Sequence, residues 1–409
     1  MHILVIAQLF PPDMGGGATR AYNAARGLAL IGCDVTIVAA FPHYPTGNIP
    51  RKYRGKLLTI EYEERLKVVR TFVPPLASEG FARRALLFIS FTFSSLFALP
   101  LVRRTSVVWA ANPNIIAMFP SLIYKMVNRC PVVQNVDDLW PEGLYDIGVS
   151  RRSFVARVGE FLARIVYRLA SAITPISPAY VDVLMNKYEV EPSKVWVVPA
   201  GVDLDKFPYK QQGFNKDGHE KFTVLYIGAF SLAYDFDQVF KAAELLTSYC
   251  DVEFLIQGGG ELADALKSKV EKMGLRNVEV VNRIVSREKV AQKLGEADAL
   301  LLPLSGVGSI EMGISSKLYE YQAAGKPILC CSSGQPGRYV SETNSGIVVK
   351  PGDYEALANS ILYLRENQSV AENLGASGRQ YVESNLSIGQ VGIRMKRVFE
   401  RVRVVEKEL

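Results

Sequence analysis

Short, strongly apolar runs of β-forming residues alternate with amphipathic helical stretches along this chain, and that alternation limits the folds it can adopt. Strands that are covered by helices on both faces have such continuous apolar sequences. The pattern therefore predicts an α/β fold with a parallel sheet between two layers of helices. The strands expected in the first half of the chain are Ile3 to Ala7, Val35 to Ala39, Val68 to Val73, Val107 to Trp109, Val132 to Gln134 and Val195 to Val198.

The same alternation begins again after a polar stretch from Tyr209 to Lys221. Two such sheets in a chain of 409 residues predict two Rossmann-like, doubly wound domains. We expect an N-terminal domain over residues 1–205, a C-terminal domain over 206–385, and a helix in 386–409 that belongs to either. The strands expected in the second half are Val224 to Ile227, Val252 to Ile256, Val278 to Val281, Ala299 to Leu302, Ile328 to Cys330 and Gly346 to Val349.

Composition narrows the class of protein and of partner. The net charge of +6 favours an anionic partner, either phosphate groups or an anionic lipid surface, and no recognised nucleic-acid module is present. The five cysteines are scattered without a C-x-x-C pair and only three histidines occur, so we expect buried thiols in a reducing, cytoplasmic compartment and no metal site. The run from His2 to Ala7 lacks a basic leader and favours a buried strand over a signal peptide.

Two stretches are candidates for membrane contact. The segment Ala85 to Val102, within residues 81–104, is apolar and lies between the pairs Arg83-Arg84 and Arg103-Arg104. It is either a buried helix of the first domain or a helix that enters one leaflet with its arginines at the headgroups. Arg151 to Leu169 has apolar residues at helical spacing and arginines between them, which is typical of a sheet-covering helix with a basic face. We therefore expect peripheral contact with the inner face of the cell membrane.

A glycine loop follows the first expected strand. Gly15, Gly16 and Gly17 precede a helical stretch, and the free amides of a helix N-terminus bind anions. With Arg20 close by, the Gly16 and Gly17 amides are candidate ligands for a phosphate. The loop lacks the G-x-G-x-x-G spacing of dinucleotide enzymes, and the second strand has no acid after it for an NAD ribose. A dehydrogenase is therefore disfavoured.

Four further sets of residues occur in a distinctive order. They are Pro11-Pro12 through Gly15-Gly16-Gly17 to Arg20 with Phe41-Pro42-His43-Tyr44-Pro45-Thr46-Gly47, then Asp138-Leu139-Trp140-Pro141-Glu142, then Val198-Pro199-Ala200-Gly201-Val202-Asp203, and finally Ser316-Lys317-Leu318-Tyr319-Glu320-Tyr321 with Ala324-Gly325-Lys326-Pro327. Over essentially its whole length the chain resembles the retaining glycosyltransferases of family 4, which have the GT-B fold of two facing Rossmann-like domains. The resemblance is nearest to the branch that builds cell-surface polysaccharides and lipid-linked glycans, such as N-acetylfucosaminyl transferases.

The fourth set of residues carries the expected donor site. Lys317 lies in the first turn of an expected helix near Ser315, where the helix dipole disfavours a cation, so a nearby anion such as a diphosphate is indicated. Glu320 lies on the same helical face, and the resemblance implies that its carboxylate accepts hydrogen bonds from both ribose hydroxyls. We expect a sugar nucleotide, with uridine as its base implied by the family, to contact Lys317, Leu318 and Glu320.

The sequence also departs from the family pattern. In the E-x7-E motif the first acid would stand at Met312, and the nearest acid is Glu311. The Arg and Lys that normally follow the first strand of the second domain are replaced by Gly228 to Asp235. We therefore expect Lys317, Arg283 and the Gly16 and Gly17 amides to neutralise the diphosphate, and Glu311 to be the candidate sugar contact.

The acceptor side is expected in the first domain, near Arg20, His43 and Tyr44. Asp138 is the candidate acid at the reacting centre, and Lys317 would stabilise the departing diphosphate. The resemblance implies transfer of a hexose or N-acetylhexosamine to a lipid-linked or cell-surface glycan with retention of configuration, and no metal or cofactor is expected. A sugar-nucleotide epimerase of the same fold and a non-catalytic nucleotide-binding scaffold remain alternatives.

Overall fold

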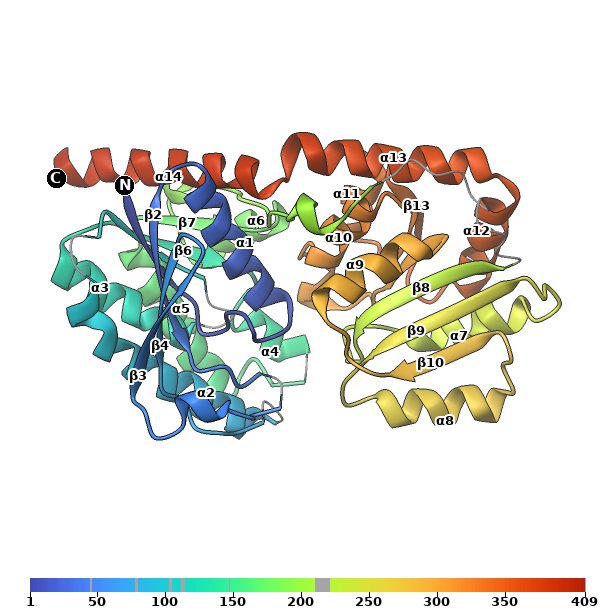
Figure 1. Ribbon diagram of the computed structural model, residues 1–409, viewed down its shortest axis with the longest axis horizontal. Coiled ribbons are helices and arrows are strands. Elements are labelled where there is room, and N and C mark those ends of the chain that lie inside the picture. The colour runs from blue at the N-terminus through green and yellow to red at the C-terminus, as the bar shows by residue number, and fades with distance from the viewer. Residues whose placement is uncertain are drawn as a thin grey trace. The chain divides into compact units, whose positions relative to one another are not determined.

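The computed structural model describes residues 1–44, 46–77, 80–102, 105–111, 115–146, 148–209 and 221–408 (Figure 1). The chain divides into two compact units. The first consists of Met1–Gly201 with Ile388–Leu409, and the second of Val202–Ser387. These divisions fall a few residues from the boundaries expected at 205 and 385. Most of the expected linker, residues 210–220, lies outside the described residues, as do Arg103 and Arg104.

The first unit is built on a seven-stranded sheet of order β3-β4-β2-β1-β5-β6-β7. Neighbouring strands are parallel except β3, which pairs antiparallel to β4. The residues of β1 from Ile3 to Ile6 are fully buried, as expected for a central strand. The strands are β1 (His2–Ile6), β2 (Asp34–Ala40), β3 (Leu58–Glu63), β4 (Leu66–Thr71), β5 (Val107–Ala110), β6 (Val132–Val136) and β7 (Ala172–Pro175).

Helices cover the first sheet. Those of the first unit are α1 (Gly16–Leu30), α2 (Phe81–Ser94), α3 (Phe119–Asn128), α4 (Glu142–Asp146), α5 (Phe154–Leu169), α6 (Ala179–Asn186) and α14 (Ile388–Glu408), with the 3-10 turns η1 (Arg51–Tyr53), η2 (Ser95–Leu101), η3 (Ile116–Met118) and η4 (Pro192–Lys194). The C-terminal helix α14 packs against α1 (Figure 1). The two helices approach closely because Gly27 and Gly392 lack side chains: a Cβ on Gly27 would lie 2.1 Å from the Ile388 carbonyl oxygen.

The second unit has a six-stranded, fully parallel sheet of order β10-β9-β8-β11-β12-β13. Its strands are β8 (Phe222–Ala229), β9 (Val252–Gly259), β10 (Val278–Asn282), β11 (Ala299–Pro303), β12 (Ile328–Cys331) and β13 (Gly346–Val349). Its helices are α7 (Phe236–Leu245), α8 (Ala263–Met273), α9 (Arg287–Glu296), α10 (Ser316–Ala324), α11 (Gln335–Glu342), α12 (Tyr354–Glu366) and α13 (Gln368–Asn385), with the turns η5 (Leu204–Lys206) and η6 (Gly308–Glu311). Apolar side chains from its strands, α7, α12 and α13 form a continuous core.

The structure corrects two expectations about strands and one about a cysteine. Val195 to Val198 does not form a strand of the sheet. Val195 pairs with Ile173 at a single position, and the strand at that edge is β7. Two amides of that run still bond along β7, from Trp196 to the Ile173 carbonyl and from Val198 to the Pro175 carbonyl. The antiparallel edge strand β3 was not expected, because the prediction used continuous apolar runs and the sequence of β3 alternates apolar and polar residues. Cys250 is exposed, whereas the other four cysteines are buried as expected.

Candidate functional site

Lys317 lies in the first turn of α10, where the sequence predicted it. Ser315 is the N-cap of the helix, and its hydroxyl accepts a hydrogen bond from the Lys317 amide at 3.4 Å. The Lys317 ammonium donates to the Tyr234 hydroxyl at 3.0 Å and lies 5.0 Å from the centroid of that ring. It also lies 5.9 Å from the centroid of the Tyr226 ring. Two aromatic rings therefore hold this cation by cation–π attraction.

Gly228 explains how the lysine reaches this position. A Cβ on Gly228 would lie 2.4 Å from Lys317 Cε, so the lysine stem occupies the space that any side chain at 228 would need. Gly228 is the penultimate residue of β8, and Tyr234 follows in the loop to α7. Lys317 thus reaches from α10 to the carboxyl end of β8, after which the family pattern has an Arg and a Lys that this chain lacks. Ligands of open α/β sheets bind at this end of the strands.

Glu320 is half-buried one turn further along α10. Burial raises the pKa of its carboxyl, while the positive charges of Arg287, Lys317 and Lys206 oppose that rise. Arg287 is the first residue of α9, and α9 packs against α10. The carboxylate is therefore partly desolvated and faces several cations. Such an arrangement is typical of a site that binds a polar, anionic ligand.

Arg287 and Lys206 were missed in the sequence. Arg287 lies in a first helical turn, where the dipole disfavours a cation, and this is the same signal that indicated Lys317. Arg283, which was expected to contact the diphosphate, lies just after β10 with an exposed side chain. Its backbone carbonyl accepts a hydrogen bond from the Gln257 amide group at 3.3 Å.

Two further residues expected at the donor are in the second unit. Glu311 ends η6, and its Oε2 accepts hydrogen bonds from the Ser332 hydroxyl at 2.7 Å and from the Gly334 amide. Its Oε1 is buried and has no hydrogen-bond partner among the described residues. Leu318 is fully buried and its amide donates to the Ser315 carbonyl, so its side chain supports α10 from the core. Among the described residues no three His, Cys, Asp or Glu side chains could together hold a metal ion.

In the first unit, Asp137 and Asp138 follow β6. Arg20 is buried and forms an ion pair with Asp137, and it donates to Asn135 Oδ1 at 2.7 Å and to the Val198 carbonyl at 3.0 Å. The arginine thus fixes this loop, a structural task that the sequence did not indicate. Asp138 reaches solvent, yet partial desolvation and the charge of Asp137 raise its pKa to about 6, with Arg20 opposing.

His43 and Tyr44 follow β2 and are tied to the loop after β1. The carboxylate of Asp13 is buried, and its Oδ1 accepts hydrogen bonds from both their backbone amides at 2.8 Å. His43 Nδ1 donates to the Phe41 carbonyl at 2.8 Å, because a carbonyl can only accept. Asp13 was missed in the sequence, where no spacing distinguishes it from an ordinary loop acid. Gly16 and Gly17 open α1 in this unit, so their amides form its N-terminus.

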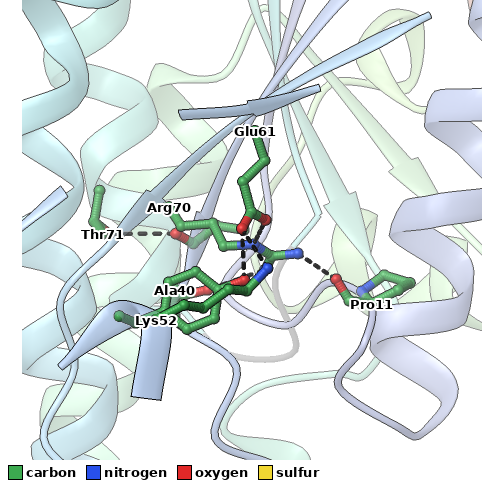
Figure 2. Close-up of polar contacts among 8 residues, drawn as sticks. Pro11, Ala40, Lys52, Glu61, Arg70 and Thr71 are labelled. Atoms are coloured by element: carbon green, nitrogen blue, oxygen red, sulfur yellow. Dashed lines mark hydrogen bonds and ion pairs between the residues drawn. The ribbon is translucent and has the colours of Figure 1, made fainter. Parts of the chain in front are cut away.

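A buried ion pair supports the same loop (Figure 2). Arg70 in β4 is 2% exposed, donates to Glu61 Oε2 at 2.6 Å, and also donates to the Pro11 carbonyl. Lys52 and Tyr53 bond the other oxygen of Glu61 at 2.8 and 2.7 Å. Although burial opposes it, these hydrogen bonds from Lys52, Arg70 and Tyr53 hold the pKa of Glu61 at about 2.

Comparison with known proteins decides the family. Residues 14–206 match the family described as Glycosyltransferase Family 4, and residues 210–381 match Glycosyl transferases group 1. Together the two matches cover nearly the whole chain, in the order that the four sets of residues predicted. The chain belongs to glycosyltransferase family 4. The resemblance seen in the sequence is confirmed at this level.

Curated relatives of this family 4 member are about a quarter identical to it over the aligned part of the chain. The 2-deoxystreptamine N-acetyl-D-glucosaminyltransferase of Niallia circulans is 28% identical over 40% of this chain and 41% of its own length. The D-rhamnosyltransferase WbpZ of Pseudomonas aeruginosa is 28% identical over 50% of this chain and 52% of its own. The chain thus spans about half the length of these relatives.

Solved structures confirm the GT-B fold. Sucrose-phosphate synthase from Thermosynechococcus elongatus aligns with a TM-score of 0.77 at 16% identity, over 99% of this chain and 100% of that one. Anabaena HepE in complex with UDP aligns with a TM-score of 0.68 at 13% identity, over 98% and 100%. At these identities the likeness concerns the fold alone.

Proposed function

We propose that this protein is a glycosyltransferase that moves a sugar from a nucleoside diphosphate sugar to a lipid-linked or cell-surface glycan. The expected nucleotide is UDP, and the transfer retains the anomeric configuration. The observation that carries the proposal is the arrangement around Glu320. A half-buried carboxylate faces Lys317, Arg287 and Lys206 on the unit that matches the group 1 family. A nucleoside diphosphate offers hydroxyls for the carboxylate and negative charge for the cations.

The demand of the reaction is stabilisation of the leaving group. When the bond from the anomeric carbon to the diphosphate oxygen breaks, both electrons leave with the diphosphate, and its added charge must be neutralised. Lys317 supplies one fixed cation: its ammonium lies at the carboxyl end of β8 and donates a hydrogen bond to the Tyr234 hydroxyl at 3.0 Å. Arg287 supplies a second from the start of α9. Together they take the place of the missing Arg and Lys, and no metal ion is needed in this proposal.

Glu311 takes the place of the missing first acid of the E-x7-E motif. Its Oε2 is engaged at the start of α11, which leaves the buried Oε1 able to accept a hydrogen bond. A sugar hydroxyl would satisfy this oxygen, and an unsatisfied buried carboxylate oxygen is costly. We therefore assign Glu311 to the donor sugar and Glu320 to the ribose.

The acceptor is assigned to the first unit. Asp138, His43 and Tyr44 follow the parallel strands β6 and β2, whose carboxyl ends lie at one edge of the sheet. A new bond forms between the acceptor oxygen and the anomeric carbon, and the acceptor hydroxyl loses its proton. Asp138, with its pKa raised to about 6, is a suitable acid–base group for a hydroxyl in this position.

The names of relatives support the substrate class. They include an N-acetyl-D-glucosaminyltransferase, a GDP-mannose-dependent phosphatidylinositol monomannoside mannosyltransferase of Corynebacterium glutamicum and a D-rhamnosyltransferase. A structural neighbour binds UDP. Because both UDP and GDP occur among these proteins, the choice between the two bases has to be measured.

The test is turnover of a panel of labelled UDP- and GDP-sugars with polyprenyl-linked acceptors. Transfer of label to lipid with the anomeric configuration of the donor supports the proposal. An isomerised free sugar nucleotide would identify an epimerase, and binding without turnover a scaffold. A product with inverted configuration would contradict retention while leaving transferase activity intact.

A further inference from the structure

The helix α2 and the turn η2 present an apolar side to solvent. The segment Ala82–Leu101 is long and apolar enough to cross a membrane, and only 28% of its most apolar stretch is buried. Its inner side, with Leu87 and Phe91, packs in the core of the first unit. Its outer side is formed by Leu86, Ile89, Phe93 and Phe97, with Phe93 66% exposed. The inner contacts with the sheet make this a surface helix instead of a spanning one.

Two neighbouring helices extend this apolar side. Helix α3 packs against both α2 and α5. Met126 of α3 is 77% exposed, and Phe154 and Phe161 of α5 are 81% and 63% exposed. Exposed apolar patches of this kind on a soluble domain indicate an interaction surface. We call the exposed side of α2, η2, α3 and α5 the α2–α5 face.

The exposed charges on this face are mostly positive. The exposed charged side chains described on or beside these helices are Arg83, Arg84, Arg129, Arg151, Arg152, Arg157, Arg164 and Arg168. The single acid within the helices, Glu160, is half-buried and pairs with Lys187 at 2.6 Å. From outside the helices, the exposed Glu189 approaches Arg164 at 3.8 Å, and Glu406 pairs with Lys125 of α3 at 2.8 Å. The face is therefore apolar and strongly basic.

We propose that the α2–α5 face docks on an anionic lipid bilayer, with the three helices lying in the plane of the interface. Apolar side chains would enter the acyl boundary, and the arginines would attract acidic headgroups. A second copy of the chain is a poorer occupant, because a symmetric dimer through this face would bring the arginines of both copies together. This partner goes beyond glycosyl transfer and does not depend on it.

The experiment measures binding of the full chain to vesicles of phosphatidylcholine alone and to vesicles of phosphatidylcholine with about 30% phosphatidylglycerol. We expect at least about tenfold stronger partition into the anionic vesicles, and a decrease as salt screens the arginines. Equal partition into both vesicle types, or none, would overturn the proposal.

Matched variants locate the surface. Phe93→Ser with Phe97→Ser, and separately Arg157→Glu with Arg168→Glu, should each lower partition at least about tenfold. Two control variants should leave vesicle partition unchanged. They are Leu30→Ser at the end of α1, where Leu30 is 59% exposed, and Lys267→Glu in α8. Equal loss in the controls, or a dimer that the face variants break without any vesicle binding, would refute the assignment. Turnover of a water-soluble acceptor should be unaffected by the face variants, so failure here is distinct from failure of the glycosyltransferase proposal.

Discussion

Glu320 is the residue on which nucleotide recognition should depend most. Removing a charge-assisted hydrogen bond to a ribose hydroxyl costs about 1.5 to 3 kcal/mol. Glu320→Gln should therefore weaken UDP binding by about tenfold to a few hundredfold, as measured by calorimetric titration. Because burial already raises the pKa of this carboxyl, the variant should not unfold the protein, and its melting temperature should stay equal or rise. Glu342→Gln, on the exposed side of α11, is the control and should bind normally.

Arg287 should behave as a phosphate ligand although it stands outside the motifs. Arg287→Gln removes one of the cations near Glu320 and should lower UDP affinity about tenfold, whereas uridine affinity should change little. Arg276→Gln removes an exposed charge of the same unit and provides the matched comparison. If both variants lose UDP affinity equally, Arg287 contributes only general charge and its assignment to the diphosphate is wrong.

If Asp138 is the acid–base group, as proposed, we expect it to give the reaction a pH dependence. Its pKa is raised to about 6, so the carboxylate is protonated as the pH falls through 6 and can no longer accept a proton. The value of kcat/KM should therefore decline tenfold per pH unit below about 6. In Asp138→Asn this acid limb should disappear together with most of the activity. A variant that keeps both the rate and the acid limb would show that another group titrates.

The candidate site residues that the sequence indicated are those whose chemistry conflicts with their local position. Lys317 was visible because a cation in a first helical turn needs a partner, and α10 begins where the sequence predicted. Arg287 carries the same signal but lacks a surrounding motif. Asp13 could not be found, because its importance arises from two amides contributed about thirty residues later. The role of Arg20 was likewise set by tertiary contacts, since Arg20 lies in α1 and its partner Asp137 lies in the loop after β6.

At the scale of elements, the edge of the first sheet depends on the pairing of Glu61 in β3 with Arg70 in β4. Glu61 has a pKa of about 2 in the fold against an ordinary 4.5, which corresponds to about 3 kcal/mol of stability at neutral pH. Glu61→Gln should lose this contribution at pH 7. Because the folded pKa is lowered, the wild type itself loses it as the pH falls from about 4.5 towards 2.

Urea unfolding at pH 7 and pH 3 tests this linkage. The difference between wild type and Glu61→Gln should be about 3 kcal/mol at pH 7 and about half of that at pH 3. Glu63→Gln, in the same strand, controls for the loss of a charge. A difference that does not change with pH would mean that the network contributes through packing instead of ionisation.

Most of the strands that the sequence predicted are buried on both faces, whereas the predicted edge strands β10 and β13 are partly exposed. In the second sheet every predicted run lies inside a strand, because the runs are rich in β-branched and other apolar residues. The errors lie at the edges of the first sheet. There β3 is half-exposed, and its apolar and polar residues alternate. The run Val195 to Val198 donates hydrogen bonds to β7 but does not form a regular strand. Edge pairing depends on tertiary partners more than on local sequence.

On the scale of the whole molecule, the chain returns to its first unit at the end. Helix α14 packs on α1 through Gly27 and Gly392, so residues from opposite ends of the chain pack together in one unit. The second unit is continuous in sequence and contains Lys317, Glu320, Arg287 and Glu311. Stability of the first unit and nucleotide binding by the second should therefore be separable in the intact protein.

Gly27→Ala tests this separation. Its Cβ would lie 2.1 Å from the Ile388 carbonyl oxygen, so α1 and α14 must move apart at a cost of about 1 to 3 kcal/mol. Scanning calorimetry of the intact protein should show two transitions, of which UDP raises one by mass action and Gly27→Ala lowers the other. Gly389→Ala, at a position with open space, should be neutral or slightly stabilising because alanine favours helix. If Gly27→Ala instead lowers the transition that UDP raises, the two units unfold together and the nucleotide site depends on the closure of α14.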